Sequence, residues 1–203
     1  VDVFTRHQVL AVDAQAKTLS VKNLETGEVF SDSYDRLILT TGASPVIPPI
    51  PGVEAINVFT VRNPERMRAL HQYLESAKPQ RALVVGSGFI GLEMAENLKR
   101  RGLEVSIVEM EDHLMKPLDP DVAIWLQEAV EAQGIGIHLS DAVVSCLGDP
   151  VETVLLRSGA RLQVDLVILA VGIRPNVSLA REMGATLGPS GAIAVDERMR
   201  TNL

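Results

Sequence analysis

The chain has very little cysteine and histidine. Its single cysteine, Cys146, excludes an internal disulfide, a Cys-x-x-Cys pair and a zinc site built from four cysteines. The four histidines stand at positions 7, 71, 113 and 138, without the spacing of metal ligands. We therefore expect no metal site. No basic residue flanks Cys146 to lower the pKa of its thiol, so we expect an unreactive, structural cysteine.

Long apolar runs and an excess of positive charge are missing as well. No stretch approaches the ~20 apolar residues of a membrane-spanning helix, and no basic segment followed by an apolar one opens the chain. Lysine and arginine number 19 against 26 acidic residues, and the net charge of −7 argues against a nucleic-acid partner. We expect a cytoplasmic protein that binds neither membranes nor nucleic acids.

The length fits one complete domain and part of a second. A typical domain has ~150 residues, and this chain has 203. It begins at Val1-Asp2 without a methionine and ends at Thr201-Asn-Leu203. We expect an internal piece of a longer protein.

A glycine-rich turn is the strongest signal in the sequence. The apolar run Arg81-Ala-Leu-Val-Val85 predicts a buried strand, glycines follow at positions 86, 88 and 91, and a helical pattern comes next. Gly86 allows a sharp exit from the strand, Gly88 keeps the backbone N–H groups accessible to an anion, and Gly91 lets the helix pack closely on the strand. The amino end of the helix would then face a pyrophosphate.

An acidic residue follows at the spacing that a dinucleotide site needs. Residues 103–108 read as a second strand, which ends at Glu109, 18 residues after Gly91. A carboxylate about 20 residues past the glycines accepts a hydrogen bond from a ribose 2′-hydroxyl and repels a 2′-phosphate. The next three residues include no arginine. The pattern predicts NAD(H) in preference to NADP(H); the alternative is a solvated carboxylate at a strand end.

The patterns around this motif complete an α/β fold. The continuous apolar run at residues 166–172 predicts a buried parallel strand. Helices are expected from Pro64 to about Glu75, capped by Asn63, and from Pro120 to Gln133. Trp125 is expected to pack on the sheet. Further strands are expected at residues 135–139, 142–147, 151–157 and 161–164, the last three as a β-meander.

Smaller elements are predicted toward the two ends of the chain. Residues 1 to about 40, Ile38 included, alternate with a period of two and read as an antiparallel meander. Residues 45–58 contain four prolines, at positions 45, 48, 49 and 51, and are predicted to be a stiff crossover between domains. Asn176 is expected to cap a short helix ending at Gly184, and residues 192–195 to form a last strand.

Three stretches together resemble the flavin-dependent pyridine nucleotide-disulfide oxidoreductases. They are Leu39-Thr-Thr-Gly-Ala-Ser-Pro45, Val85-Gly-Ser-Gly-Phe-Ile-Gly-Leu-Glu93 and Ala170-Val-Gly-Ile-Arg-Pro-Asn176. The resemblance implies a Rossmann-like NAD-binding domain, a parallel sheet plus a β-meander, inserted in remnants of an FAD domain. The stretch from Glu109 to Pro120 resembles the branch of coenzyme A disulfide reductases, NADH oxidases and persulfide reductases. The implied ranges are 1–45 for the first FAD-domain segment, 46–60 for a linker, 61–172 for the NAD(H) domain and 173–203 for the returning FAD-domain segment.

The resemblance also implies roles for individual residues. The three glycines of the turn would hold the pyrophosphate of NAD(H), and Glu109 the adenosine ribose. Phe89 would cover the flavin, where relatives often carry tyrosine, and Ile90 would line the nicotinamide pocket. Glu93 matches an acidic position near nicotinamide and flavin. The remaining positions are Gly172 on the nicotinamide side and Thr41 and Gly42 near FAD.

Some of these residues have simpler explanations. Phe89 could be part of the core, and Glu93 could favour the first turn of its helix through the helix dipole. The segment Arg174-Pro175-Asn176 could be a turn followed by a helix cap rather than a cofactor contact.

The family implies a function for the longer protein. It would pass a hydride from NADH to FAD, and electrons on to a disulfide, a persulfide or oxygen. No catalytic residue is expected in this chain, because the redox cysteine would precede residue 1, and a domain that forms a homodimer would follow residue 203. Two alternatives are a flavin-free NAD-dependent dehydrogenase domain and a flavoprotein electron-transfer module of a larger reductase, such as a nitrite reductase.

Overall fold

The computed structural model describes residues 2–203, which form two compact units. One unit comprises the residues up to Ser44 together with Arg174–Leu203, and the other is Pro45–Ile173. Every residue predicted to bind NAD(H) lies in the Pro45–Ile173 unit.

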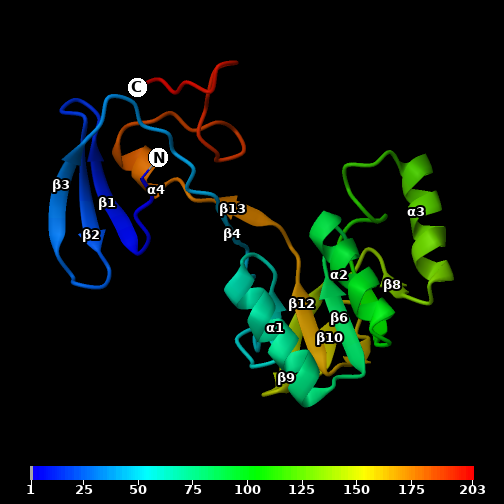
Figure 1. Cartoon of the computed structure of the whole chain (residues 1–203). Helices are drawn as coiled ribbons and strands as arrows, with labels where there is room; N and C mark the ends of the chain where they lie inside the picture. The colour runs from blue at the N-terminus through cyan, green and yellow to red at the C-terminus, as the bar shows by residue number, and fades with distance from the viewer. Residues whose placement is uncertain (1) are drawn as a thin grey trace. The chain divides into compact units, whose positions relative to one another are not determined.

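A parallel five-stranded sheet forms the centre of this unit (Figure 1). The strand order is β5-β12-β6-β7-β8, and all four pairings are parallel. Sequence order reverses between β6 and β12, which is the switch point where such sheets leave a crevice at the carboxyl ends of their strands. The bounds are β5 (Val58–Thr60), β6 (Arg81–Val85), β7 (Glu104–Val108), β8 (Gly136–His138) and β12 (Leu166–Leu169).

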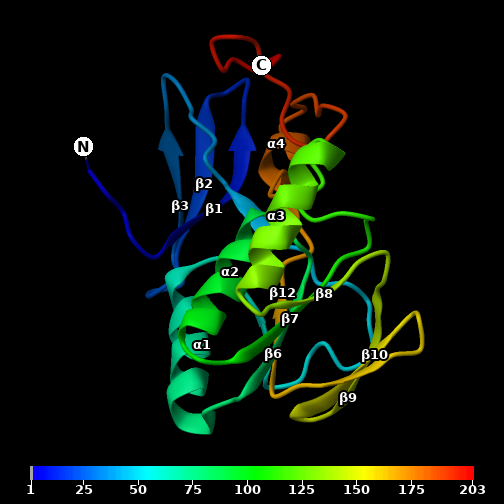
Figure 2. The same ribbon diagram turned by 90° about the vertical axis from the view of Figure 1, so that its right-hand side faces the viewer.

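Helices cover one face of the sheet and an antiparallel meander covers the other (Figure 2). Successive side chains of a strand point to opposite faces. Ala82 and Val84 of β6 therefore belong to the core under the helices, and Leu83 and Val85 to the core under the meander. The elements are α1 (Pro64–Ala77), α2 (Phe89–Arg100), α3 (Pro120–Ala132), β9 (Val143–Gly148), β10 (Val151–Leu156) and β11 (Arg161–Gln163).

The predicted starts of α1 and α3 are confirmed. The Asn63 side chain accepts a hydrogen bond from the Arg66 amide at 2.9 Å, and α1 continues to Ala77, two residues past the predicted end. Helix α3 starts at Pro120, but the Asp119 side chain makes no capping hydrogen bond. No helix within residues 2–203 is both long enough and apolar enough to cross a membrane.

Two predictions for this unit are wrong. The predicted linker, residues 46–60, ends too late, because its last three residues form β5, which pairs with β12. Three residues are too few to show a strand period in the sequence. Trp125 is 72% exposed and does not pack on the sheet, because α3 turns other residues, such as Leu126, toward the core.

The other unit is built on a three-stranded antiparallel meander, as predicted. Its strands are β1 (His7–Asp13), β2 (Thr18–Asn23) and β3 (Val29–Ser33), in that order. Ile38 lies outside these strands and is 84% exposed, so its predicted place in the meander is wrong. Two short connecting strands, β4 (Ala43–Pro45) and β13 (Ile173–Pro175), pair with each other.

Asn176 has a different role from the predicted cap. Helix α4 (Ser178–Glu182) has Val177 at its N-cap position and no side-chain cap. Instead, the side-chain amide of Asn176 donates through its nitrogen to the Thr41 backbone carbonyl at 2.9 Å. Its oxygen accepts a hydrogen bond from the Ser44 hydroxyl at 2.8 Å. The predicted strand at 192–195 is also wrong, since only the single bridge Leu187–Ile193 forms there.

Candidate functional site

The glycine turn connects β6 to α2, and its outer glycines are required by packing. Gly86 has φ +98°, and a Cβ on it would lie 2.5 Å from the Ala170 carbonyl oxygen. A Cβ on Gly91 would lie 2.0 Å from the Gly86 carbonyl oxygen. The turn can therefore sit this close to the end of β12 only with glycine at both positions.

Packing does not require the middle glycine. A Cβ on Gly88 would meet no atom within 4 Å, and the residue has an ordinary φ of −69°. Gly88 is also the N-cap of α2 and offers no side chain to the first-turn N–H groups. The positive end of the helix dipole therefore lies beside open space next to Gly88, a combination that suits an anion.

The carboxylate of Glu109 is tied to this turn. One of its oxygens accepts hydrogen bonds from the amide and the hydroxyl of Ser87, at 2.8 and 2.7 Å. The other accepts from the amides of Met110 at 2.7 Å and Glu111 at 3.0 Å. Partial burial acts against the charged form, but these hydrogen bonds outweigh it and lower the pKa of Glu109. Glu109 is thus held ionised beside the amino end of α2.

This network excludes one interpretation of Glu109. A merely solvated strand-end carboxylate is wrong, because four protein donors surround the group. Ser87, which is buried, was missed by the sequence analysis. The only signal for it was a hydroxyl between two glycines.

The residues that open α2 are accessible. Phe89 is 77% exposed and Ile90 is 42% exposed, so core packing does not explain Phe89. Glu93 is also exposed. Because α2 begins at Phe89 and its first turn has no acidic residue, the helix dipole does not explain Glu93 either.

Gly172 follows β12 on the same edge of the sheet. It has φ +106°, and a Cβ there would meet no atom within 4 Å. Its carbonyl accepts a hydrogen bond from the Val46 amide at 3.0 Å. The structure thus places Gly172 beyond the carboxyl end of the strand that neighbours the glycine turn.

Thr41 and Gly42 belong to the other unit. The Thr41 hydroxyl donates a hydrogen bond to the backbone carbonyl of Asn176 at 2.6 Å. The backbone N–H of Asn176 donates to the Gly42 carbonyl at 3.0 Å. Residues 173–175 form strand β13, so the interpretation of Arg174-Pro175-Asn176 as a turn and a cap is wrong.

The loop after β7 carries an ion pair that the sequence analysis did not identify. The Lys116 ammonium group contacts a carboxylate oxygen of Glu111. The bond to Glu111 raises the pKa of Lys116, and the charges of Glu111 and Glu109 act in the same direction. Lys116 therefore lies within the electrostatic reach of Glu109.

The lone cysteine has no part in this arrangement. Cys146 is 5% exposed, and burial followed by the charge of Glu54 raises the pKa of its thiol. Cys146 is thus buried, which agrees with a structural role, and its low reactivity stays a prediction.

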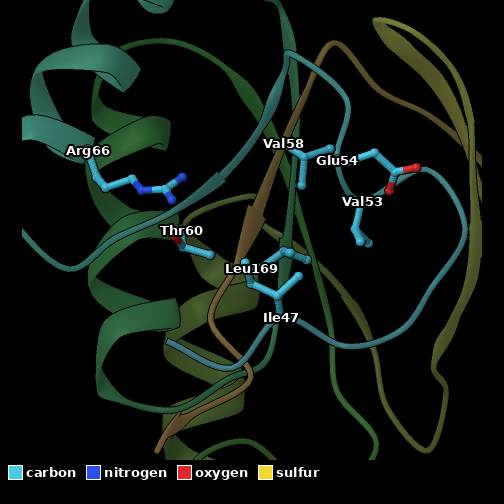
Figure 3. Close-up of a pocket in the computed structure, with 7 residues that line it drawn as sticks. All are labelled: Ile47, Val53, Glu54, Val58, Thr60, Arg66 and Leu169. Atoms are coloured by element: carbon cyan, nitrogen blue, oxygen red, sulfur yellow. The ribbon is translucent and has the colours of Figure 1, made fainter. Parts of the chain in front are cut away.

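A separate cavity of about 310 Å³ lies beside β5 (Figure 3). None of the predicted cofactor-binding residues lines it. Its lining is mainly apolar, with Arg66 and Glu54 as charged members, so it is distinct from the glycine turn. The lining residues are Ile47, Val53, Glu54, Val58, Thr60, Arg66 and Leu169.

The fold and the turn define a class. A parallel sheet with a switch point, a glycine turn leading into a helix and a carboxylate at the end of the next strand make up a Rossmann-like dinucleotide-binding fold.

Comparison with known proteins gives the family. Residues 1–203 match the family described as pyridine nucleotide-disulphide oxidoreductase, and the chain belongs to it. An NADH oxidase from Methanocaldococcus jannaschii is 40% identical over 100% of this chain and 45% of its own length. A coenzyme A disulfide reductase from Staphylococcus aureus is 32% identical, with the same coverage. The chain therefore spans a little under half the length of these relatives.

Solved structures agree with this assignment. An NAD-dependent persulfide reductase from A. fulgidus has a TM-score of 0.93 and 34% identity, over 100% of this chain and 37% of its own. A water-forming NADH oxidase from Lactobacillus brevis, bound to NADH, has a TM-score of 0.86 and 30% identity, over 96% of this chain and 43% of its own. A mutant of that enzyme, engineered as an NADPH oxidase and bound to NADPH, has a TM-score of 0.84 and 30% identity, with the same coverage.

Proposed function

We propose that this chain is the NADH-binding part of an FAD-dependent oxidoreductase, which passes a hydride from NADH to FAD and electrons on to a disulfide, a persulfide or oxygen. The observation that carries the proposal is Gly88. Its missing side chain leaves open space at the amino end of α2, where no neighbouring atom requires a glycine. A pyrophosphate is the group that such a space and such a helix end accommodate.

The residues of the turn have distinct tasks in this proposal. The first-turn N–H groups of α2 bind the pyrophosphate, and Glu109 accepts a hydrogen bond from the adenosine ribose. A carboxylate has about four acceptor positions, and protein donors already use four. A ribose hydroxyl therefore takes the place of one of them. The hydroxyl hydrogen of Ser87 can turn about its C–O bond, so it is easier to redirect than the three backbone amides.

The remaining site residues serve the hydride-transfer end. FAD, when bound, supplies the electron-accepting ring. Exposed Phe89 and Ile90 are proposed to cover that ring and line the nicotinamide pocket, with Glu93 and Gly172 nearby. The Thr41 hydroxyl already donates within the protein, so the chain offers FAD mainly the backbone of that turn. Homodimer formation and a cytoplasmic location stay predictions.

The preference for NADH over NADPH rests on Glu109 and on the engineered NADPH oxidase. That mutant changes a glycine and an aspartate 18 residues apart, both to alanine, and changes the residues one, two and seven positions after the aspartate to arginine, serine and arginine. Gly91 and Glu109 have the same spacing. Counted from Glu109, the other three positions are Met110, Glu111 and Lys116. This chain thus keeps the carboxylate that was removed to accommodate NADPH.

The test is titration calorimetry of the 203-residue chain with NADH, NADPH and ADP-ribose. We expect binding of NADH and ADP-ribose at the same site, and at least tenfold weaker binding of NADPH. We also expect no steady oxidation of NADH by the chain alone. Absence of heat with NADH, or steady turnover without an added flavoprotein, would contradict the proposal.

A further inference from the structure

The ion pair between Lys116 and Glu111 joins two positions of the loop between β7 and α3. Both residues belong to the loop that starts at Glu109, the carboxylate proposed to bind the ribose. The loop is anchored to the glycine turn, because the Met115 amide donates to the Ser87 hydroxyl at 3.2 Å. Lys116 comes directly after this anchor.

Glu111 is anchored on the other side of the loop. Its own amide donates to Glu109, and its carbonyl accepts from the Ser140 amide at 2.8 Å. Its side chain contacts the Lys116 ammonium group. The side chains of Lys116 and Glu111 are 74% and 40% exposed, so the pair forms in solvent and is readily broken.

By spacing, these two residues correspond to positions that were substituted in the engineered enzyme. Seven residues after the replaced aspartate, the engineered enzyme gained an arginine, and this chain already has a basic residue, Lys116, seven residues after Glu109. Two residues after that aspartate, the engineered enzyme gained a serine, and this chain has Glu111. The chain therefore carries one cation suited to a 2′-phosphate together with a carboxylate that neutralises it.

We infer that Glu111 determines cofactor specificity, by pairing with Lys116 and thereby withholding this ammonium group from a 2′-phosphate. The inference rests on the proposed function. Glu111 would thus make a second contribution, besides that of Glu109, to the preference for NADH over NADPH. Glu111 also places a negative charge near the phosphate, which repels it directly.

The test compares Glu111→Ser, Lys116→Met and the double variant with the unmodified chain, by calorimetric titration with NADH and with NADPH. In Glu111→Ser we expect the ratio of the NADPH Kd to the NADH Kd to fall about tenfold, or ~1.4 kcal/mol. In the double variant most of that gain should disappear, because the released ammonium group is absent. Raising the salt concentration should also reduce the gain, since exposed charges are screened.

A matched control is Glu96→Ser, which removes another exposed carboxylate, paired with Arg100 at 2.7 Å on α2. It should leave the ratio unchanged. If the Glu111→Ser ratio stays at its starting value, or if the double variant gains as much as Glu111→Ser, the inference is overturned while the proposed function stands. Absence of NADH binding to the unmodified chain would overturn both.

Discussion

Ser87 donates both its amide and its hydroxyl hydrogen to the same oxygen of Glu109, at 2.8 and 2.7 Å. The sequence predicted the glycine turn and the acidic residue from their spacing alone. The structure joins them through a residue that this spacing does not include. The end of β7 and the start of α2 are therefore a single hydrogen-bonded site.

The first prediction concerns acid stability. The pKa of Glu109 in the folded chain lies below its ordinary value of 4.5, so the stability it contributes is present above that value and is lost as pH falls through the lowered pKa. Glu109→Gln leaves part of the donors without an acceptor, and we expect a cost of about 1–3 kcal/mol at pH 7. The loss should become smaller as pH falls below 4.5 and through the lowered pKa of Glu109.

Thermal unfolding followed by circular dichroism between pH 7 and pH 3 measures this difference. Glu152→Gln, at an exposed carboxylate on β10, is the control and should unfold like the unmodified chain. A Glu109→Gln deficit of the same size at every pH would rule out a contribution from the charged carboxylate.

The second prediction separates the two kinds of glycine. Gly88→Ala adds a methyl group into open space at an N-cap position, so it should cost less than about 1 kcal/mol of stability, while NADH affinity falls at least about tenfold. Gly91→Ala pushes a methyl group against the Gly86 carbonyl, and we expect a loss of roughly 1–3 kcal/mol of stability. Calorimetry and urea unfolding together distinguish the two.

Gly188→Ala serves as the control for this pair. Its Cβ would lie 3.8 Å from the Ala192 carbonyl oxygen, an ordinary contact far from the turn in sequence. It should change neither stability nor affinity. Unweakened NADH binding by Gly88→Ala would mean that the open space does not hold the pyrophosphate.

The third prediction compares two phenylalanines. Phe89 is 77% exposed, so Phe89→Ala should change the free energy of unfolding by no more than about 0.5 kcal/mol. Phe59 lies in the core under the helices and is 8% exposed, so Phe59→Ala should lower the free energy of unfolding by about 3–5 kcal/mol. Urea titration measures both. Phe89→Ala should also weaken NADH relative to ADP-ribose; an equal effect on both ligands would argue against a place beside the nicotinamide.

The fourth prediction concerns the buried thiol. Because Cys146 is buried and its pKa is raised, iodoacetamide should modify it at least about 100-fold more slowly in the folded chain than in urea. Mass spectrometry of the alkylated chain gives both rates. Rapid modification of the folded chain would show that β9 opens far more readily than its packing suggests.

The sequence predicted best where neighbouring residues decide the outcome. The strand, glycine turn and helix at 81–100, the Asn63 cap and the β9–β11 meander depend on local patterns and turn residues. The predictions failed where residues far away in the sequence form hydrogen bonds with a side chain. The residues next to Asn176 suggest a helix cap, but its side-chain amide donates a hydrogen bond to the carbonyl of Thr41, 135 residues away in sequence.

The sequence by itself determined the class of fold and the positions of the turn and its acidic partner, because glycine spacing and hydrophobic period are properties of consecutive residues. Only the tertiary structure decided that Ser87 holds Glu109, that Glu111 neutralises Lys116, that β5 extends the sheet and that Trp125 faces solvent. Those outcomes depend on which side chains meet after the chain has folded. A one-dimensional pattern contains no direct record of such contacts.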